Sequence, residues 1–151
     1  MGMPNTLLAE DNATNAMLIQ TILKAVGCPV ACVENGRDAV DAAALQAFDL
    51  ILMDVQMPIM DGLTAIRHIR QAEAAAGERP SRIYTVTTND LPADIRAAFD
   101  AGADGHITKP LTPGILLDAI ASVRTRKSKA VGLPRPPPIQ AAVGAPSAQR
   151  A

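Results

Sequence analysis

Short apolar runs alternate with segments of helical spacing along most of the chain. The apolar runs predict five strands, at 6–9, 30–33, 50–54, 83–87 and 106–108. Helical spacing, together with glycines that end helices, predicts a helix after each strand, at 15–26, 36–47, 63–76, 93–101 and from 113 to about 126. Strands that alternate with helices are typical of parallel sheets joined by right-handed crossovers. The pattern therefore predicts an α/β domain with a doubly wound, five-stranded parallel sheet covered by helices on both faces.

Two helices carry further signals. In the first helix, one side is predicted to face the sheet through the apolar residues Leu18, Ile19, Ile22, Leu23 and Val26. In the last helix, a threonine that can cap the helix precedes a proline at the first helical position, as residues 112 and 113.

The composition changes after residue 126. The chain has 151 residues, which is the size of one ordinary domain, and proline, alanine and glycine dominate its last part. Residues 127–151 contain no acidic residue and no apolar period. This proline- and alanine-rich basic tail is therefore predicted to be disordered, and the folded domain is predicted to span residues 1–126. The tail is interpreted as a solvated linker, with contact to an acidic partner as the alternative. The chain is interpreted as a stand-alone domain or as part of a larger protein.

Charge and cysteine content exclude several classes of protein. The net charge of −1 gives no electrostatic basis for nucleic-acid binding. Cys28 and Cys32 are predicted to be free thiols, because His68 and His106 lie too far along the sequence to complete a metal site with them. No apolar run approaches the ~20 residues of a membrane span, so no membrane association and a cytoplasmic location are expected. No phosphate-binding glycine motif supports nucleotide binding.

Charged and hydroxyl side chains follow the predicted strands at their carboxyl ends. These residues are Glu10, Asp11, Asp54, Thr87 and Lys109. In open parallel sheets the carboxyl ends of the strands form the binding crevice, so these side chains are expected to meet at one edge. Three neighbouring carboxylates repel one another, and a hard divalent cation such as Mg²⁺ relieves that repulsion.

The same set of groups suits phosphoryl transfer. That reaction needs a metal on the phosphoryl oxygens, a cation that spreads charge and a nucleophile in line with the bond that breaks. Asp54 is the natural nucleophile, because carboxylates form acyl-phosphate intermediates. Taken singly, Asp54 is better explained as a turn or capping acid. Glu10 and Asp11 are then explained as helix caps, Lys109 as a surface lysine and Thr87 as an ordinary strand residue. The joint occurrence of all of them at strand ends favours the phosphoryl-transfer interpretation.

Four sequence blocks carry a family resemblance. The blocks are LLAEDNATN, ILMDVQMPIMDG, VTTND and GHITKP. In order and spacing they resemble the receiver domains of bacterial two-component response regulators, and most of all receivers attached to, or served by, hybrid histidine kinases. The resemblance covers about residues 6–126. It implies a flavodoxin-like, CheY-like fold with strand order 2-1-3-4-5 and five helices.

The resemblance also implies roles for the acidic cluster. Asp54 would be the phosphoacceptor. Mg²⁺ would be bound directly by Asp11, by Asp54 and by the backbone carbonyl of Gln56, with Glu10 acting mainly through metal-bound water.

Further roles follow for the other strand ends. Thr87 would be the switch hydroxyl and Lys109 the cation that binds the phosphoryl group, next to a Lys109–Pro110 bond that resembles a cis bond of the family. His106 takes the place of the usual Tyr or Phe switch, so weaker and pH-sensitive coupling is expected. Thr88 stands where alanine is common and narrows access to the site. The positions expected to modulate the reaction are Gln56, Thr88 and Asn89.

The resemblance implies a phosphorelay function with protein partners. The chain would accept a phosphoryl group from a histidine kinase or a histidine phosphotransfer protein, and would catalyse only its own phosphorylation and the hydrolysis of its aspartyl-phosphate. The signal would leave through the face of helix four, strand five and helix five, which is expected to carry Arg96, Asp100, Leu116 and Asp118. The expected state is a monomer or a weak phosphorylation-dependent dimer, and the downstream target is unknown.

Two other functions fit the sequence less well. A Mg²⁺-dependent phosphohydrolase normally has a second acid two positions after its nucleophile, but Gln56 stands there and no cap domain is present. A degenerate binding module that is never phosphorylated conflicts with the intact set of site residues.

Overall fold

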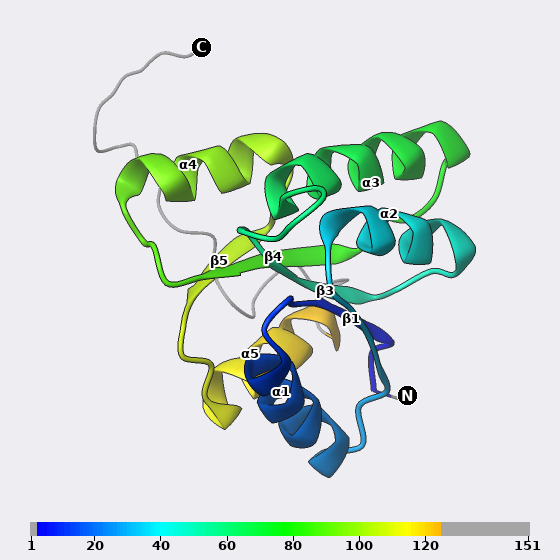
Figure 1. Ribbon diagram of the computed structural model, residues 1–151. Helices are drawn as coiled ribbons and strands as arrows, with labels where there is room; N and C mark the ends of the chain where they lie inside the picture. The colour runs from blue at the N-terminus through cyan, green and yellow to red at the C-terminus, as the bar shows by residue number, and fades with distance from the viewer. Residues whose placement is uncertain (1–2, 125–151) are drawn as a thin grey trace.

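Five parallel strands form one sheet in the computed structural model, which describes residues 3–124 (Figure 1). The strands are β1 (Thr6–Ala9), β2 (Val30–Val33), β3 (Leu50–Asp54), β4 (Arg82–Thr87) and β5 (Gly105–Thr108). Their order is β2-β1-β3-β4-β5, and every neighbouring pair is parallel. The predicted fold class and strand order are therefore confirmed. The predicted tail at 127–151 lies outside the described residues.

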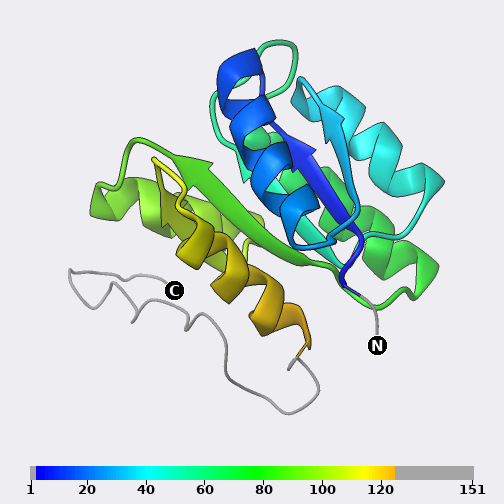
Figure 2. The same cartoon turned by 90° about the horizontal axis from the view of Figure 1, so that it is seen from below.

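The helices cover both faces of the sheet, as two views at right angles show (Figures 1 and 2). One face is covered by α1 (Ala13–Ala25) and α5 (Pro113–Arg124). The other face is covered by α2 (Gly36–Leu45), α3 (Gly62–Ala76) and α4 (Pro92–Ala101). This arrangement confirms the doubly wound architecture that the alternating pattern predicted.

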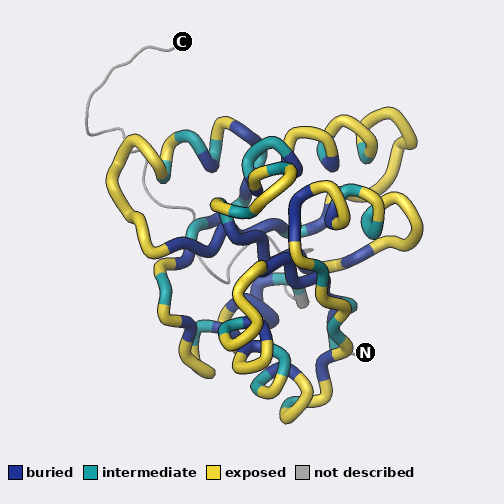
Figure 3. The backbone as a smooth tube through the Cα atoms, viewed as in Figure 1, coloured by how far each residue is buried: buried dark blue, intermediate teal, exposed yellow. Residues whose placement is uncertain are grey.

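Each face of the sheet has its own hydrophobic core, and buried backbone follows the strands in Figure 3. Alternate residues of one strand contribute to different cores because successive side chains point to opposite faces. In β3, for example, Leu52 packs with α1 and α5, whereas Ile51 and Met53 pack on the other face. The fully buried Tyr84 donates a hydrogen bond from its hydroxyl to Ser122 Oγ at 2.6 Å, so its polar group is satisfied inside the first core.

Two predictions about exposed and buried positions were wrong. Leu18 was expected to face the sheet, but it is 51% exposed. The buried stripe of α1 is Ala16, Ile19 and Leu23, and a neighbouring position such as 18 is rotated by about 100° away from that stripe. Leu116 was expected on the outer face of α5, but it is 1% exposed and belongs to the core.

The structure also bears on the predicted helix starts, the cysteines and membrane spans. Helix α1 begins two residues earlier than predicted, because Asn12 Oδ1 accepts a hydrogen bond from the Asn15 amide at 2.9 Å and so caps the helix. Thr112 Oγ1 likewise accepts from the Ile115 amide at 3.2 Å, as expected for a cap of α5. Within residues 3–124, both cysteines are free thiols, and no helix is long and apolar enough to cross a membrane.

Candidate functional site

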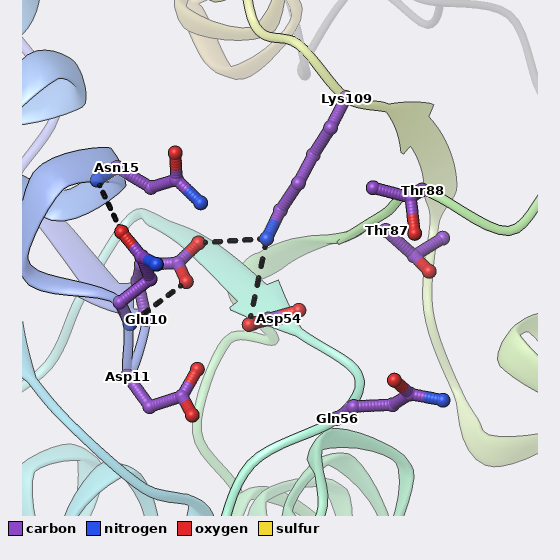
Figure 4. A pocket seen from close by; sticks show the side chains of 9 residues that line it. Glu10, Asp11, Asn15, Asp54, Gln56, Thr87, Thr88 and Lys109 are labelled. Carbon is purple, nitrogen blue, oxygen red and sulfur yellow. Dashed lines mark hydrogen bonds and ion pairs between the residues drawn. The ribbon is translucent and has the colours of Figure 1, made fainter.

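The carboxyl ends of the strands enclose a pocket of about 220 Å³ (Figure 4). It contains the five residues that the sequence placed at strand ends, together with residues from the adjoining loops and α1. The lining residues are Glu10, Asp11, Asn12, Asn15, Asp54, Gln56, Thr87, Thr88 and Lys109. The strand connectivity therefore brings the predicted charged and hydroxyl side chains to one place.

Asp54 is held by the rigid centre of the sheet. It is the last residue of β3, a strand that is buried along its whole length and pairs with β1 and β4. Its side chain is 8% exposed. Burial raises the pKa of Asp54 to about 7, the negative charge of Glu10 adds to that rise, and the positive charge of Lys109 opposes it. The protein therefore destabilises the ionised form of this carboxyl group unless a further positive charge is present.

Glu10 and Lys109 form an ion pair inside the pocket. The Glu10 side chain is 1% exposed, and one of its carboxylate oxygens accepts a hydrogen bond from the Asn12 amide at 3.1 Å. Lys109 Nζ lies 3.0 Å from the other Glu10 oxygen and 3.6 Å from Asp54 Oδ2. The ammonium group thus lies between two buried carboxylates and is closer to Glu10 (Figure 4). The bond from Lys109 to Pro110 is cis, as the resemblance implied.

The acidic cluster has the composition of a divalent cation site. Glu10, Asp11 and Asp54 each offer a carboxylate oxygen, and these oxygens lie within 4.8 Å of one another. Glu10 and Asp54 are buried and Asp11 is exposed, so the cluster opens to solvent on the Asp11 side. Oxygen ligands with several places left for water are what Mg²⁺ prefers. The three carboxylates therefore fit a magnesium ion.

Two threonines line the opposite side of the pocket from Glu10 (Figure 4). Thr87 ends β4 and is buried, and its hydroxyl oxygen accepts a hydrogen bond from the Asn89 amide at 3.0 Å. That bond leaves the Thr87 hydroxyl proton available for an acceptor in the pocket. Thr88 is exposed and also lines the pocket.

Two residues that the sequence assigned to the site lie outside the pocket. Asn89 is exposed, and its side chain accepts a hydrogen bond from the Leu91 amide at 3.4 Å, so it orders the loop that leads to α4. His106 is half-buried on β5, where its ring nitrogens lie 3.3 Å from Thr85 Oγ1 and 3.5 Å from Thr108 Oγ1. Burial lowers the pKa of His106, and the negative charges of residues 90 and 94 oppose that shift.

The sequence interpretation missed two asparagines of the pocket. Asn12 is the N-cap residue of α1, and Asn15 lies in the first turn of that helix. A signal was present, because both lie within the block that also contains Glu10 and Asp11. A capping residue directly after a strand end has to lie close to the crevice that the strand ends form.

Comparisons with known proteins agree with this geometry. Residues 6–121 match the response regulator receiver domain family. The sensor protein GacS of Pseudomonas syringae pv. syringae is 40% identical over 109 residues, which cover 72% of this chain and 12% of GacS. The hybrid signal transduction histidine kinase I of Dictyostelium discoideum is 36% identical over 119 residues, 76% of this chain and 7% of the kinase. The chain thus spans a small part of the length of these relatives.

Solved structures show the same fold. One of them is the receiver domain of the sensor histidine kinase PA1611 from Pseudomonas aeruginosa, which was solved with a magnesium ion coordinated in its active-site cleft. It is 34% identical to this chain with a TM-score of 0.69, and the match covers 78% of this chain and 93% of that domain. The receiver domain of Saccharomyces cerevisiae Ssk1, in complex with the histidine phosphotransfer protein Ypd1, is 26% identical with a TM-score of 0.78, covering 83% and 94%. Fold, site geometry and sequence match lead to one conclusion: the chain belongs to the response regulator receiver domain family of two-component signalling systems.

Proposed function

We propose that this receiver accepts a phosphoryl group on Asp54 from a phosphohistidine of a histidine kinase or a histidine phosphotransfer protein. The observation that carries the proposal is the position of Asp54 Oδ2, which lies at the end of β3 in an open pocket, 3.6 Å from Lys109 Nζ. The relatives named as histidine kinases and the neighbour solved with a phosphotransfer protein support this class of donor.

The reaction forms one bond and breaks another. A carboxylate oxygen of Asp54 attacks phosphorus while the bond from phosphorus to the donor's imidazole nitrogen breaks, and the imidazole keeps the bonding electron pair. Lys109 Nζ, already between Glu10 and Asp54, would stabilise the negative charge on the phosphoryl oxygens. The Thr87 hydroxyl would donate a hydrogen bond to one of these oxygens once the group is transferred.

We infer that Mg²⁺ is the cofactor and that Asp11, Asp54 and the Gln56 backbone carbonyl would hold it, with Glu10 acting through water. The close approach of three carboxylate oxygens supports this assignment. When bound, the ion supplies positive charge that neutralises the carboxylates and the phosphoryl oxygens. Thr88 and the side chain of Gln56 line the entrance, so they would set how readily water reaches the phosphoryl group and hydrolyses it.

Intact-mass measurement after incubation with acetyl phosphate and Mg²⁺ tests the acceptor. The wild-type protein is expected to gain one phosphoryl group, which hydroxylamine removes because an acyl-phosphate is labile to it. Asp54→Ala is expected to gain none. Asp41→Ala, which removes an exposed acid on α2, is the matched control and is expected to behave like the wild type. Full labelling of Asp54→Ala would contradict the proposal.

A further inference from the structure

The two ends of α4 are held in different ways. At its C-terminal end, Ala98 and Ala101 are buried in the core and Gly102 ends the helix in the left-handed conformation. The Gly102 carbonyl accepts a hydrogen bond from Arg70 Nε of α3 at 2.9 Å. A side chain at 102 would press on Arg70, because an added Cβ would lie 2.8 Å from Arg70 Cγ. This end of the helix is therefore fixed to its neighbour.

Arg70 connects that end to three other elements. Its Nη1 donates to Glu73 Oε1 and to the Ser81 carbonyl, both at 2.8 Å, and its Nη2 donates to Asp104 Oδ2 at 2.9 Å. Asp104 Oδ2 also accepts from the Ile83 amide at 2.9 Å. The Arg70 side chain is 21% exposed, so these charge-assisted bonds are partly shielded from water. One guanidinium group thus joins α3, the start of β4, the end of α4 and the start of β5.

The N-terminal end of α4 has few anchors. The helix begins after Leu91, which supplies no side-chain cap, and residues 91–94 are all exposed. Figure 3 shows this exposed start and the buried end of the same helix. The helix has no large apolar side chain that is fully buried, since its buried residues are two alanines. Weak packing and a missing cap make this end the easier one to displace.

The sheet below α4 is also polar. Thr85 pairs with His106, and Thr87 pairs with Thr108, across β4 and β5. Alternate residues share a face, so all four side chains lie on the same side as Ile83, which packs in the core with Ala98 and Ala101. The buried apolar contacts of α4, at Ala98 and Ala101, therefore lie in the C-terminal half of the helix.

Thr87 links this loose end to the phosphorylation site. Three residues, 88–90, separate it from Leu91 at the start of α4, and the Asn89 amide donates to the Thr87 hydroxyl. We propose that Arg70 is the positioning residue that fixes the pivot of α4, so that phosphorylation of Asp54 swings the N-terminal half of the helix while the end at Gly102 stays in place. This inference rests on the proposed function. The C-terminal end of α4 is held by a polar network, and its N-terminal end is weakly packed. When the N-terminal end is displaced, such a helix rotates about its fixed end, as in a hinge motion.

Amide chemical shifts and hydrogen exchange, recorded with Mg²⁺ and with or without beryllofluoride as the phosphoryl mimic, test the pivot in the wild-type protein. The expected result is at least a threefold larger mean shift change for residues 88–96 than for residues 98–104. Equal changes along both segments would overturn the proposal. Absence of any change around Asp54 would instead show that the mimic does not bind, and would count against the proposed function on which the pivot rests.

Substitutions distinguish a positioning role of Arg70 from a role in which it only stabilises the fold. In Arg70→Met, the chemical-shift changes caused by beryllofluoride are expected to extend into residues 98–104. Acetyl phosphate is expected to label Asp54 in this variant at a rate within twofold of the wild type. Arg67→Met removes an exposed arginine of the same helix and is expected to keep the wild-type pattern. Asp104→Asn removes the charge that pairs with Arg70 but keeps an oxygen that can accept from the Ile83 amide. If Arg70→Met does not fold, Asp104→Asn is used to test whether the Arg70 network fixes the C-terminal end of α4. Changes that stay confined to 88–96 in the variant that folds would overturn the role of Arg70.

Discussion

At the scale of single residues, the site depends on a carboxyl group whose ionisation the surrounding protein opposes. Burial and the charge of Glu10 raise the pKa of Asp54 to about 7, although Lys109 lies close enough to offset part of that effect. In an unfolded chain the pKa of the same group is 3.8. The folded, metal-free domain therefore binds a proton at Asp54 more tightly than the unfolded chain does.

This difference makes the stability of the metal-free domain depend on pH. The stabilising contribution of the proton is complete below about pH 4 and is lost as the pH rises through about 7. The free energy of unfolding of the wild type is therefore expected to fall by about 1–3 kcal/mol between pH 5 and pH 8, given about 1.4 kcal/mol per pKa unit. Asp54→Asn cannot ionise, so it is expected to be more stable than the wild type at pH 8. Urea denaturation in the presence of a chelator measures both quantities.

Asp41→Asn serves as the control for this measurement. Asp41 is exposed on α2, away from the pocket, so its substitution is expected to leave the pH dependence unchanged. If Asp54→Asn retained the same fall between pH 5 and pH 8 as the wild type, another group would be responsible.

The sequence predicted which residues meet at the site but not how they pair. Charges at the ends of parallel strands are bound to converge, which is why Glu10, Asp54 and Lys109 were found without a structure. The placement of Lys109 Nζ closer to Glu10 than to Asp54 depends on side-chain rotamers and on the loop after β5. The resemblance implied a modulating role for Asn89 at the site, but the side chain of Asn89 accepts a hydrogen bond from the Leu91 amide in the turn after Thr87.

At the scale of elements, the geometry of the site depends on how closely α3 approaches β3. Gly62 opens α3, and its amide donates to the Val55 carbonyl at 2.8 Å. A Cβ at this position would overlap the Asp54 carbonyl oxygen and would lie 2.9 Å from Met53 Cγ. Since the Asp54 carbonyl belongs to the backbone, the contact cannot be relieved by rotating a side chain. Glycine is therefore required for the position of β3 and of Asp54 at its end.

Gly62→Ala is expected to destabilise the domain by about 1–3 kcal/mol, the usual cost of forcing atoms into a packed site. It is also expected to slow labelling of Asp54 by acetyl phosphate, because the strand end has to shift. Gly114→Ala is the control: the nearest atom to its added Cβ is Thr112 Oγ1 at 3.9 Å, so stability should stay the same or rise by about 0.4–1 kcal/mol. Wild-type stability and labelling rate in Gly62→Ala would contradict the requirement for close approach.

Element types were more predictable from the sequence than their orientations. The apolar runs gave the bounds of β1, β2 and β3 as the structure has them. Continuous burial explains the apolar runs of β1 and β3, but not that of β2, whose residues are exposed or half-buried. The orientation of α1 was predicted wrongly at Leu18, since several apolar residues on a helix leave more than one possible buried stripe. The small residue Ala16 faces the core instead, and alanine carries little signal of burial in an alanine-rich chain.

At the scale of the whole molecule, the site lies where the two cores meet at one edge of the sheet. Asp54 ends β3 and Glu10 directly follows β1, and both strands belong to the sheet that separates these cores. The two carboxylates are therefore fixed by the same packing that stabilises the fold. A cation bound between them would be linked to global unfolding, because the unfolded chain does not hold the three carboxylates together. The stability of the domain is therefore a direct measure of occupancy at the site.

Mg²⁺ is expected to raise the midpoint of thermal unfolding, and to do so more at pH 8 than at pH 5.5. The sign follows from Asp54, whose raised pKa means that protons compete with the metal at the lower pH. Asp11→Asn is expected to lose most of this rise, yet to be at least as stable as the wild type in chelator at pH 8, because the charge of Asp11 also raises the pKa of Asp54. Sodium chloride at matched ionic strength controls for screening, and Asp118→Asn controls for the loss of an exposed acid. An equal rise at both pH values, or a full rise in Asp11→Asn, would show that the ion stabilises the fold from another place.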